Sequence, residues 1–306
     1  MTSAVVFAYH DVGVRCLATL LAHGMDVKLV VTHQDNPAEQ IWFASVAELA
    51  RTNDLEVIAP KRADDPNLLV RLRQLAPDFL FSFYYRHMLA PELLGTARRG
   101  ALNMHGSLLP KYRGRVPVNW AILRGERQTG ASLHYMLAKP DAGDLVDQMA
   151  IPIHPDDNAL AVFRKLTVAA ELVLDRSLPA LVDGTAARRP LDLAQGSYFG
   201  ARSAADGRID WNASAQQVHD LVRAVAPPYP GAFTSLGGRS LRILQTRRDA
   251  EPIHSAAGQI TFRDGRWHVG CGSGSVCVLS AELDGKPLLA SHLTAHAAAG
   301  AGLRFG

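Results

Sequence analysis

The segment 101-ALNMHGSLLPKYRGR-115 joins a short apolar run to a turn rich in polar and basic residues. We predict that residues 101–105 end a buried strand, and on a strand the side chains two residues apart point to the same face. Asn103 and His105 should therefore lie side by side at the carboxyl end of this strand. An amide that donates to an oxyanion, next to an imidazole that moves a proton, meets the two chemical needs of acyl transfer.

Outward from this segment, short apolar or β-branched runs recur along the first third of the chain, at residues 4–9, 27–32, 55–58, 79–83 and 101–105. Leucine stripes with helical spacing separate several of these runs, and a longer helical pattern covers residues 158–181. This alternation predicts an α/β fold with a Rossmann-like, doubly wound parallel sheet. The first run leads into His-Asp-Val-Gly at residues 10–13, which lacks the glycines of the dinucleotide fingerprint, so no nicotinamide cofactor is expected.

The pattern of apolar residues in the sequence changes after about residue 190. A helix is predicted over 214–225, and five β runs follow it at 233–236, 240–246, 259–262, 267–271 and 275–280. With a hairpin signal at Asp264-Gly265, this pattern predicts a small, open, OB-like β-barrel. We therefore expect a catalytic domain over 1–190, a connection over 191–207 and a C-terminal domain over 208–306. The alanine- and glycine-rich tail at 290–302 is expected to be partly disordered.

Composition describes an ordinary globular protein, with 306 residues, 48% hydrophobic and 20% charged, and a length suited to two domains. The net charge of +3 is too small to indicate a nucleic-acid binder. Three cysteines, at positions 16, 271 and 277, have no paired short spacing and predict free thiols, not disulfides or a zinc site. The first apolar run is too short for a signal peptide, and no stretch reaches about 20 apolar residues, so a cytoplasmic protein without membrane insertion is expected.

The 103–115 segment resembles the signature of the folate-dependent formyltransferases, which is Asn-x-His followed by Ser-Leu-Leu-Pro, basic residues and Arg-Gly. The third catalytic group of that family is an Asp in an Asp-x-Gly-Asp turn, and residues 141–144 read Asp-Ala-Gly-Asp. The resemblance implies that Asn103 stabilises the oxyanion, that His105 moves the proton, and that Asp141 raises the imidazole pKa. It also implies the two-domain layout and 10-formyltetrahydrofolate as co-substrate, with no metal.

The same resemblance implies the folate contacts, which are His87, Met88, Leu89, Arg115, Leu137, Ala138, Lys139 and Pro140. An ordinary core edge explains the apolar members of this set nearly as well. Lys111, Arg113 and Arg115 place three cations within five residues, which suits phosphates or the glutamate of a folate tail; a solvated basic loop is the alternative. Ser107 is expected to cap the turn and not to act as a nucleophile, because Gly-x-Ser-x-Gly is absent.

Two features of the sequence favour a nucleotide-linked amino sugar over initiator tRNA as the formyl acceptor. Residues 32–40 contain two acids and no Lys or Arg, whereas the tRNA enzymes of the family carry a basic insertion there, and the motif reads His-Gly-Ser instead of His-Pro-Ser. Within the family, the chain resembles the formyltransferase domain of the bifunctional enzymes that make UDP-4-formamido-4-deoxy-L-arabinose, on the evidence of residues 7–11, 32–37, 81–87, 111–115 and 119–120. That similarity implies UDP-4-amino-4-deoxy-L-arabinose as substrate, a role in lipid A modification and polymyxin resistance, and no nucleic-acid partner.

Asn119, Trp120 and Arg223 are the residues that we expect to contact the sugar nucleotide, with a surface arginine as the alternative for Arg223. The bifunctional enzymes carry a decarboxylating dehydrogenase domain that these 306 residues lack, so either the dehydrogenase lies on a separate chain or the substrate is a different nucleotide-linked amino sugar. The exact sugar and the oligomeric state, a homo-oligomer included, stay open. Two other functions remain as alternatives: a methionyl-tRNA formyltransferase and a formyltetrahydrofolate deformylase.

Overall fold

A computed structural model describes residues 1–37, 39–288 and 303–306, and the predicted disordered tail at 290–302 lies outside these residues. The chain divides into two compact units. The first contains Met1–Pro117, Gln128–Pro152 and Phe163–Gly200, and the second contains Val118–Arg127, Ile153–Val162 and Ala201–Gly306. Two short segments that precede residue 163 thus belong to the second unit.

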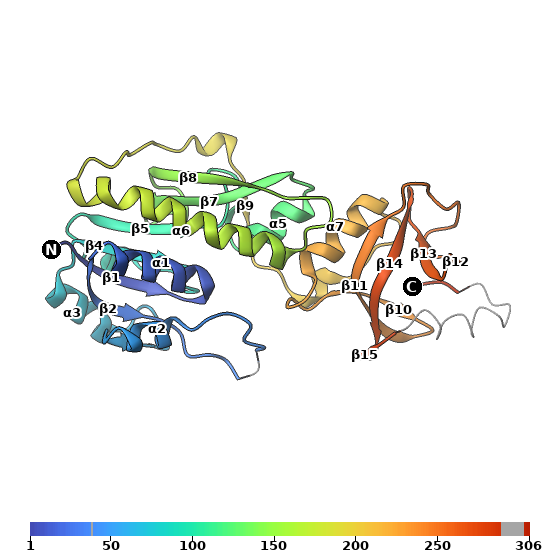
Figure 1. The fold of residues 1–306 in the computed structure, drawn as a ribbon, viewed down its shortest axis with the longest axis horizontal. Helices are drawn as coiled ribbons and strands as arrows, with labels where there is room; N and C mark the ends of the chain where they lie inside the picture. Colours follow the sequence, from blue (N-terminus) through green and yellow to red (C-terminus); the bar gives the residue numbers. More distant parts are fainter. Residues whose placement is uncertain (38, 289–302) are drawn as a thin grey trace. The chain divides into compact units, whose positions relative to one another are not determined.

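A seven-stranded sheet with the order β3-β2-β1-β4-β5-β7-β8 forms the centre of the first unit (Figure 1). Its strands are β1 (Ser3–Ala8), β2 (Asp26–Val31), β3 (Val57–Ile58), β4 (Phe79–Phe83), β5 (Gly100–His105), β7 (Gln128–Tyr135) and β8 (Leu145–Pro152). The first five pair in parallel, which confirms the Rossmann-like prediction. β7 and β8 extend the sheet as an antiparallel hairpin that the sequence patterns did not reveal. A separate ladder joins β6 (Arg113–Gly114) to β9 (Tyr198–Phe199).

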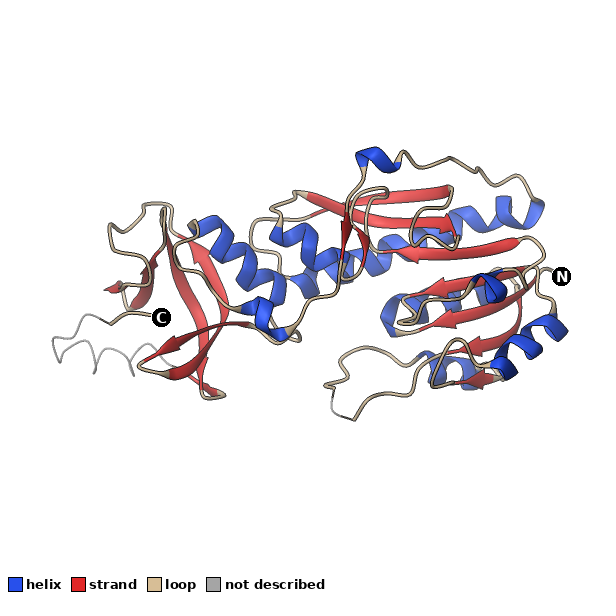
Figure 2. Ribbon diagram, turned by 180° about the vertical axis from the view of Figure 1, so that it is seen from behind, coloured by secondary structure: helices blue, strands red, loops and turns tan. Residues whose placement is uncertain are grey.

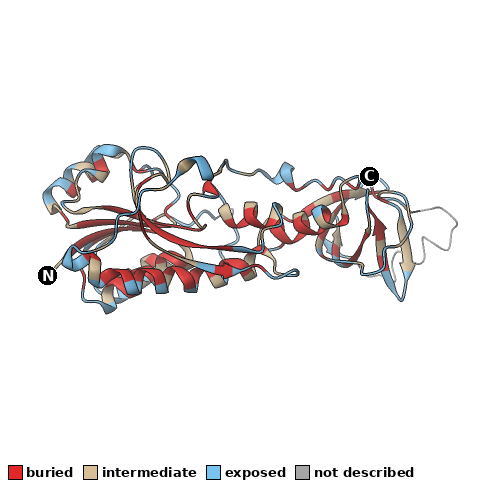
Figure 3. Ribbon diagram, turned by 90° about the horizontal axis from the view of Figure 1, so that it is seen from above, coloured by how far each residue is buried: buried red, intermediate tan, exposed pale blue. Residues whose placement is uncertain are grey.

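Helices pack against this sheet (Figure 2). They are α1 (His10–Ala22), α2 (Val46–Thr52), α3 (Pro66–Leu75), α4 (Pro91–Leu94) and most of α6 (Ala159–Asp183), while the short 3₁₀ helix η1 (Leu193–Gln195) has no buried residue. Arg15 of α1 forms an ion pair with Glu171 of α6, which shows that the two helices lie side by side. The predicted leucine stripe of α3 is buried, with Leu68 and Leu72 in the same core cluster as Leu80 of β4. Figure 3 shows the central strands in red, and every residue of β1 and β4 is buried, as expected for strands covered on both faces.

An antiparallel sheet with the order β10-β11-β14-β13-β12 forms the second unit, and β15 pairs with β14. The elements are α5 (Pro117–Leu123), η2 (Ala204–Gly207), α7 (Ala215–Val225), β10 (Ala232–Leu236), β11 (Arg239–Arg248), β12 (Ile260–Arg263), β13 (Arg266–Gly270), β14 (Ser275–Leu283) and β15 (Lys286–Pro287). Phe305 bridges Leu236 of β10 while Arg304 bridges Gln259 beside β12, so the end of the chain connects the two edge strands. This pairing gives the open, OB-like arrangement that was predicted.

Local signals explain how the second unit forms. Ser214 caps α7 through a capping box with Gln217, and Val218 and Val222 of this helix pack with Trp267 in the core. Asp264 and Gly265 both have positive φ, 52° and 71°, as a tight hairpin between β12 and β13 requires. Within the described residues, no helix is long and apolar enough to cross a membrane.

Candidate active site

Asn103 and His105 lie on β5, and Asn103 is directly opposite His134 of the antiparallel neighbour β7. Because cross-strand partners share a face, as do residues two apart on one strand, all three side chains point to the same side of the sheet. Asn103 Nδ2 and His134 Nε2 are 3.1 Å apart. His105 is buried, with 6% of its surface exposed. The strand pairing therefore places an amide and two imidazoles in one row.

Asp141 reaches this row from the connection between β7 and β8. Its Oδ1 lies 3.5 Å from His105 Nδ1 and also 3.5 Å from His134 Nε2. Its Oδ2 accepts a hydrogen bond of 2.8 Å from the backbone N–H of Gly114. The structure thus brings together the three residues that the sequence singled out, Asn103, His105 and Asp141, and adds His134 to them.

Two glycines of the sequence motifs have a steric explanation. A Cβ on Gly143 would overlap the carbonyl oxygen of Tyr135, where the Asp141 turn folds back onto β7. A Cβ on Gly114 would overlap the carbonyl oxygen of Phe199, and the φ of +97° at Gly114 also disfavours a side chain. The motif glycines therefore allow two backbone segments to approach closely enough to hold the Asp141 carboxylate.

The His105 ring is held by a hydrogen bond at one nitrogen. Nε2 donates to the backbone carbonyl of Tyr112 at 2.8 Å, which leaves Nδ1 facing Asp141. Burial lowers the pKa of His105, and this effect outweighs the opposing influence of the Asp141 charge and the Tyr112 carbonyl. The carboxylate of Asp141 acts in the predicted direction and raises the imidazole pKa, but burial has the larger effect and the net shift is downward. His105 is therefore a neutral ring at neutral pH, with a free acceptor at Nδ1.

Asp141 keeps its negative charge in this buried position. Burial raises the pKa of the carboxyl group, but the positive charge that His105 and His134 carry when protonated, together with the N–H of Gly114, favours the ionised form. Their combined effect holds the pKa of Asp141 well below its usual range. The site therefore pairs a permanent anion with a neutral imidazole that can accept a proton.

His134 orients Asn103. Its Nδ1 donates to the backbone carbonyl of Tyr135 at 2.8 Å, so in the neutral ring Nε2 is the acceptor for Asn103 Nδ2. This bond occupies one N–H of the amide and leaves the other for a ligand. Sequence reasoning missed His134 because the strand pattern of residues 128–135 was not recognised. Had β7 been predicted as the partner of β5, the alternation of side chains would have drawn attention to this residue.

Several residues near the carboxyl ends of β1, β4 and β5 have left-handed backbone conformations without being glycine. They are His10 (φ 69°), Tyr84 (58°), Tyr112 (57°), Val116 (47°) and Asp141 (49°). Such conformations are especially unfavourable for a β-branched residue such as Val116. Strain of about 1–3 kcal/mol per residue persists where the surrounding structure imposes it, often at functional sites.

An aromatic cluster adjoins the end of β5. The ring of His10 stacks on Phe43 at 3.9 Å between centroids and meets Trp42 edge-on at 4.5 Å. Tyr84 belongs to the same cluster, and its hydroxyl occupies the space that a Cβ on Gly106 would need. Burial, with a contribution from Arg86, lowers the pKa of His10 to about 3, so this ring is uncharged. The Gly in the His-Gly-Ser motif is thus explained by packing against Tyr84.

The predicted folate residues lie on two segments with accessible apolar side chains. Met88, after β4, is 62% exposed, and Leu137, after β7, is 56% exposed. Leu89 is buried and Pro140 is half-buried, while His87, Ala138, Lys139 and Arg115 are exposed. Among the three motif cations, Arg113 is buried, and its Nε has no hydrogen-bond partner among the described residues. Ser107 Oγ donates to the Lys111 carbonyl at 2.6 Å, consistent with its predicted role in the turn.

The residues predicted to contact a sugar nucleotide belong to the second unit. Asn119 is buried and donates to the Ala224 carbonyl at 2.6 Å. Arg223 is also buried, with Nε bonded to Asp220 at 2.8 Å and a terminal nitrogen bonded to the Asp157 carbonyl at 3.0 Å. Trp120 is more accessible, and the guanidinium of Arg202 lies 4.9 Å from the centre of its ring.

Two family models match this chain: "Formyl transferase" over residues 10–177 and "Formyl transferase, C-terminal domain" over residues 202–296. One similar solved structure is an N-formyltransferase from Helicobacter canadensis in complex with folinic acid and dTDP-3-aminofucose. It is 18% identical in sequence, with a TM-score of 0.73, and the match covers 91% of this chain and 99% of that chain. Another is WlaRD, a sugar 3N-formyl transferase crystallised in the presence of dTDP and 5-N-formyl-THF. It is 17% identical, with a TM-score of 0.73, and the match covers 94% of this chain and 99% of that chain. HypX from Aquifex aeolicus, with tetrahydrofolic acid, is 19% identical with a TM-score of 0.63, over 95% and 46%. At these identities the likeness is one of fold.

Proposed function

This chain belongs to the formyl transferase family, and we propose that it transfers the formyl group of 10-formyltetrahydrofolate to the amine of a nucleotide-linked amino sugar. The observation that carries the proposal is the cluster of Asn103, His105 and Asp141, completed by His134. It combines a fixed amide donor with a buried neutral imidazole beside a carboxylate. An amine that attacks a formyl carbon requires these groups.

Each group has a defined task in this reaction. As the acceptor nitrogen attacks the formyl carbon, Asn103 Nδ2 donates to the oxygen that becomes negatively charged. His105 Nδ1 takes the proton released by the nitrogen, and Asp141, 3.5 Å away, stabilises the resulting imidazolium. The same proton then passes to N10 of the folate as the bond between N10 and the formyl carbon breaks. The products are the formamido sugar and tetrahydrofolate.

The folate part of the proposal is supported by the surface next to this cluster. Met88 and Leu137 are large apolar side chains exposed to solvent, which suits contact with a flat ring system. Arg115 is exposed, and a terminal nitrogen of its guanidinium lies 3.4 Å from the Arg86 carbonyl, so it remains available for an anionic tail. His87, Leu89 and residues 138–140 complete the proposed contacts.

For the acceptor, the finer proposal is UDP-4-amino-4-deoxy-L-arabinose, with a role in lipid A modification and polymyxin resistance. In the acidic loop at 32–40, Glu39 pairs with Arg86 and Asp35 accepts from Tyr9, so these acids support residues at the ends of β4 and β1. Together with the net charge of +3, this favours a small anionic acceptor over tRNA. In the second unit, Trp120 is the accessible candidate contact, whereas Asn119 and Arg223 would have to exchange their present bonds.

A donor-consumption assay tests the proposal. Release of tetrahydrofolate is followed with four separate additions: UDP-4-amino-4-deoxy-L-arabinose, a dTDP-linked 3-amino sugar, charged initiator tRNA, and buffer alone. We expect release with a sugar nucleotide and a product heavier by one formyl group. Release only with tRNA would establish the tRNA enzyme instead, and equal release in buffer would establish a deformylase.

A further inference from the structure

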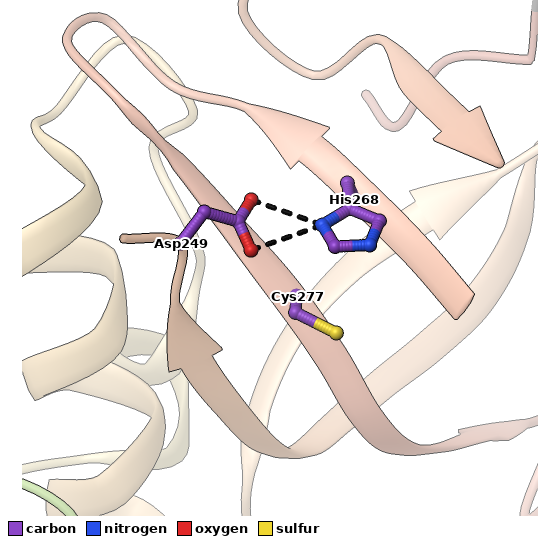
Figure 4. A group of neighbouring side chains, drawn as sticks. All are labelled: Asp249, His268 and Cys277. Carbon is purple, nitrogen blue, oxygen red and sulfur yellow. Dashed lines mark hydrogen bonds and ion pairs between the residues drawn. The ribbon is translucent and has the colours of Figure 1, made fainter. Parts of the chain in front are cut away.

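Three side chains with metal-binding atoms meet on the second unit, outside the catalytic cluster. The carboxylate of Asp249 faces the ring of His268, and Cys277 is next to them (Figure 4). His268 Nδ1 lies 2.9 Å and 3.0 Å from the two carboxylate oxygens. One donor atom from each of the three residues lies within 4.8 Å of the others. Nothing in the formyl-transfer reaction uses these groups.

The sheet holds the cluster in place. His268 on β13 and Cys277 on β14 are direct cross-strand partners. Asp249 directly follows β11, which pairs with β14 on its other side. A hydrogen bond from Asp249 N to the Ser275 carbonyl continues this pairing by one residue. The neighbouring residues of opposite parity, Trp267 and Val276, belong to the hydrophobic core. The three ligating groups therefore stand on the other face of the sheet, and the strand pairing fixes the backbone positions that carry them before any ion binds.

A second layer of hydrogen bonds orients the carboxylate. Ser275 Oγ donates to Asp249 Oδ2 at 2.5 Å, and Ile253 N donates to Ser275 Oγ at 3.0 Å. Support of this kind is typical of metal ligands, whose own partners fix their direction. Asp249 and His268 retain 10% and 13% side-chain exposure, so an ion can reach them, while Cys277 is 3% exposed.

We propose that Asp249, His268 and Cys277 form a binding site for a divalent transition metal, with Zn²⁺ as the ion that fits their donor set. Carboxylate oxygen, imidazole nitrogen and thiolate sulfur are all zinc ligands, and zinc sites with three protein ligands hold water in the fourth position. Bond lengths of about 2.0–2.3 Å separate tetrahedral ligand atoms by roughly 3.3–3.7 Å. The His268–Asp249 pair, 2.9 Å apart, opens by a few tenths of an ångström to admit the ion, and a rotation of the Cys277 side chain toward the pair closes the remaining gap.

Binding exchanges protons for the ion. The Cys277 thiol loses its proton to solvent as the sulfur–zinc bond forms, and the proton on His268 Nδ1 moves to Nε2 through water. Burial raises the pKa of this thiol, while Arg266, which bonds it, and Arg247, which lies opposite on β11, act in the other direction. Arg266 also competes with the ion for the sulfur.

The test uses the full-length protein, stripped of metal, with zinc chloride for stoichiometry and cobalt chloride for spectroscopy. We expect one bound ion per chain and a sulfur-to-cobalt charge-transfer band. Cys277→Ser should lose the band and at least tenfold in affinity, and Ser275→Ala should lose about tenfold. Asp249→Asn preserves side-chain shape and serves if Cys277→Ser folds poorly. Cys271→Ser, another buried cysteine of the same unit, is the matched control and should keep both signals.

Two results would overturn the proposal. One is a wild-type protein that takes up no zinc at micromolar concentrations. The other is a band and an affinity that survive in both Cys277→Ser and Asp249→Asn. Neither readout depends on formyl transfer, so the outcome is independent of the proposed reaction.

Discussion

Each unit of this protein contains a histidine–aspartate pair, and the two pairs differ in almost everything except residue type. In the first unit, His105 and Asp141 are 3.5 Å apart, and backbone groups of Tyr112 and Gly114 hold them. In the second unit, His268 and Asp249 are bonded at 2.9 Å on one face of a sheet. The first pair lies beside an amide and the second beside a thiol.

The difference shows that neighbours decide what such a pair can do. Beside Asn103, the neutral ring of His105 can receive a proton while an oxyanion forms a few ångströms away. Beside the second pair, Cys277 adds a thiolate as the third ligand, so the ring, the carboxylate and the thiolate can together hold a metal ion. A histidine near an aspartate is therefore no functional assignment until the third group is known.

The largest expected effect comes from breaking the first pair. His105→Ala should lower kcat by about 10²- to 10⁴-fold with KM little changed, because the ring acts on the proton and not on binding. Steady-state kinetics with the sugar-nucleotide acceptor measures this. His23→Ala removes a histidine that also pairs with an aspartate, Asp175, but on the surface, and should keep wild-type kinetics. Wild-type turnover in His105→Ala would remove this residue from the mechanism.

The amide beside the first pair should matter nearly as much. Asn103→Ala should lower kcat by about 10²- to 10³-fold, the usual cost of losing one oxyanion donor. His134→Gln should lower it by roughly tenfold, because His134 orients the amide and does not touch the substrate. In the double variant the two losses should fall short of additive, since without Asn103 there is nothing for His134 to orient. Fully additive losses would mean that His134 acts by another route.

Removing the charge of the first pair should move the pH profile. Asp141 raises the pKa of His105 against the effect of burial, so in Asp141→Asn the imidazole pKa falls further. The acidic limb of kcat/KM, where the base becomes protonated, should shift to lower pH by about one unit or more. Asp144→Asn changes a carboxylate in the same turn and should leave the limb in place. An unshifted limb in Asp141→Asn would show that this charge does not act on His105.

The smallest expected effect concerns the second pair, His268 and Asp249, and is a change in the free energy of unfolding. Zinc at about 100 times its dissociation constant should stabilise the protein by about 2.7 kcal/mol, which raises Tm by several degrees. Cys277→Ser should show no zinc-dependent rise, whereas Asp141→Asn should show the full one. Differential scanning calorimetry with and without zinc makes the comparison. A zinc effect that disappears in Asp141→Asn would place the ion at the first pair instead.

Sequence patterns predicted the local elements well where periodicity is strong. The five parallel strands, the helix over 158–181 and the Asp264-Gly265 hairpin follow from apolar spacing and from residues that tolerate positive φ. The antiparallel hairpin of β7 and β8 was missed, and His134 with it. Its strands are recognisable only through their pairing with β5 and with each other, which is a contact between distant parts of the chain.

By itself, the sequence determined the chemical groups of the catalytic cluster: the amide, the imidazole and the carboxylate stand in motifs whose spacing specifies a strand followed by a turn. Only the tertiary structure decided their state. The pKa of His105 depends on how much water its burial removes, and the direction of Asn103 depends on a histidine 31 positions away. The cluster of Asp249, His268 and Cys277 leaves no spacing signal, because two of its ligands lie on β13 and β14 and the third lies just after β11, and these parts of the chain become neighbours only when the sheet forms. Residue type is local information, whereas desolvation and ligand geometry are properties of atoms that the folded chain brings together.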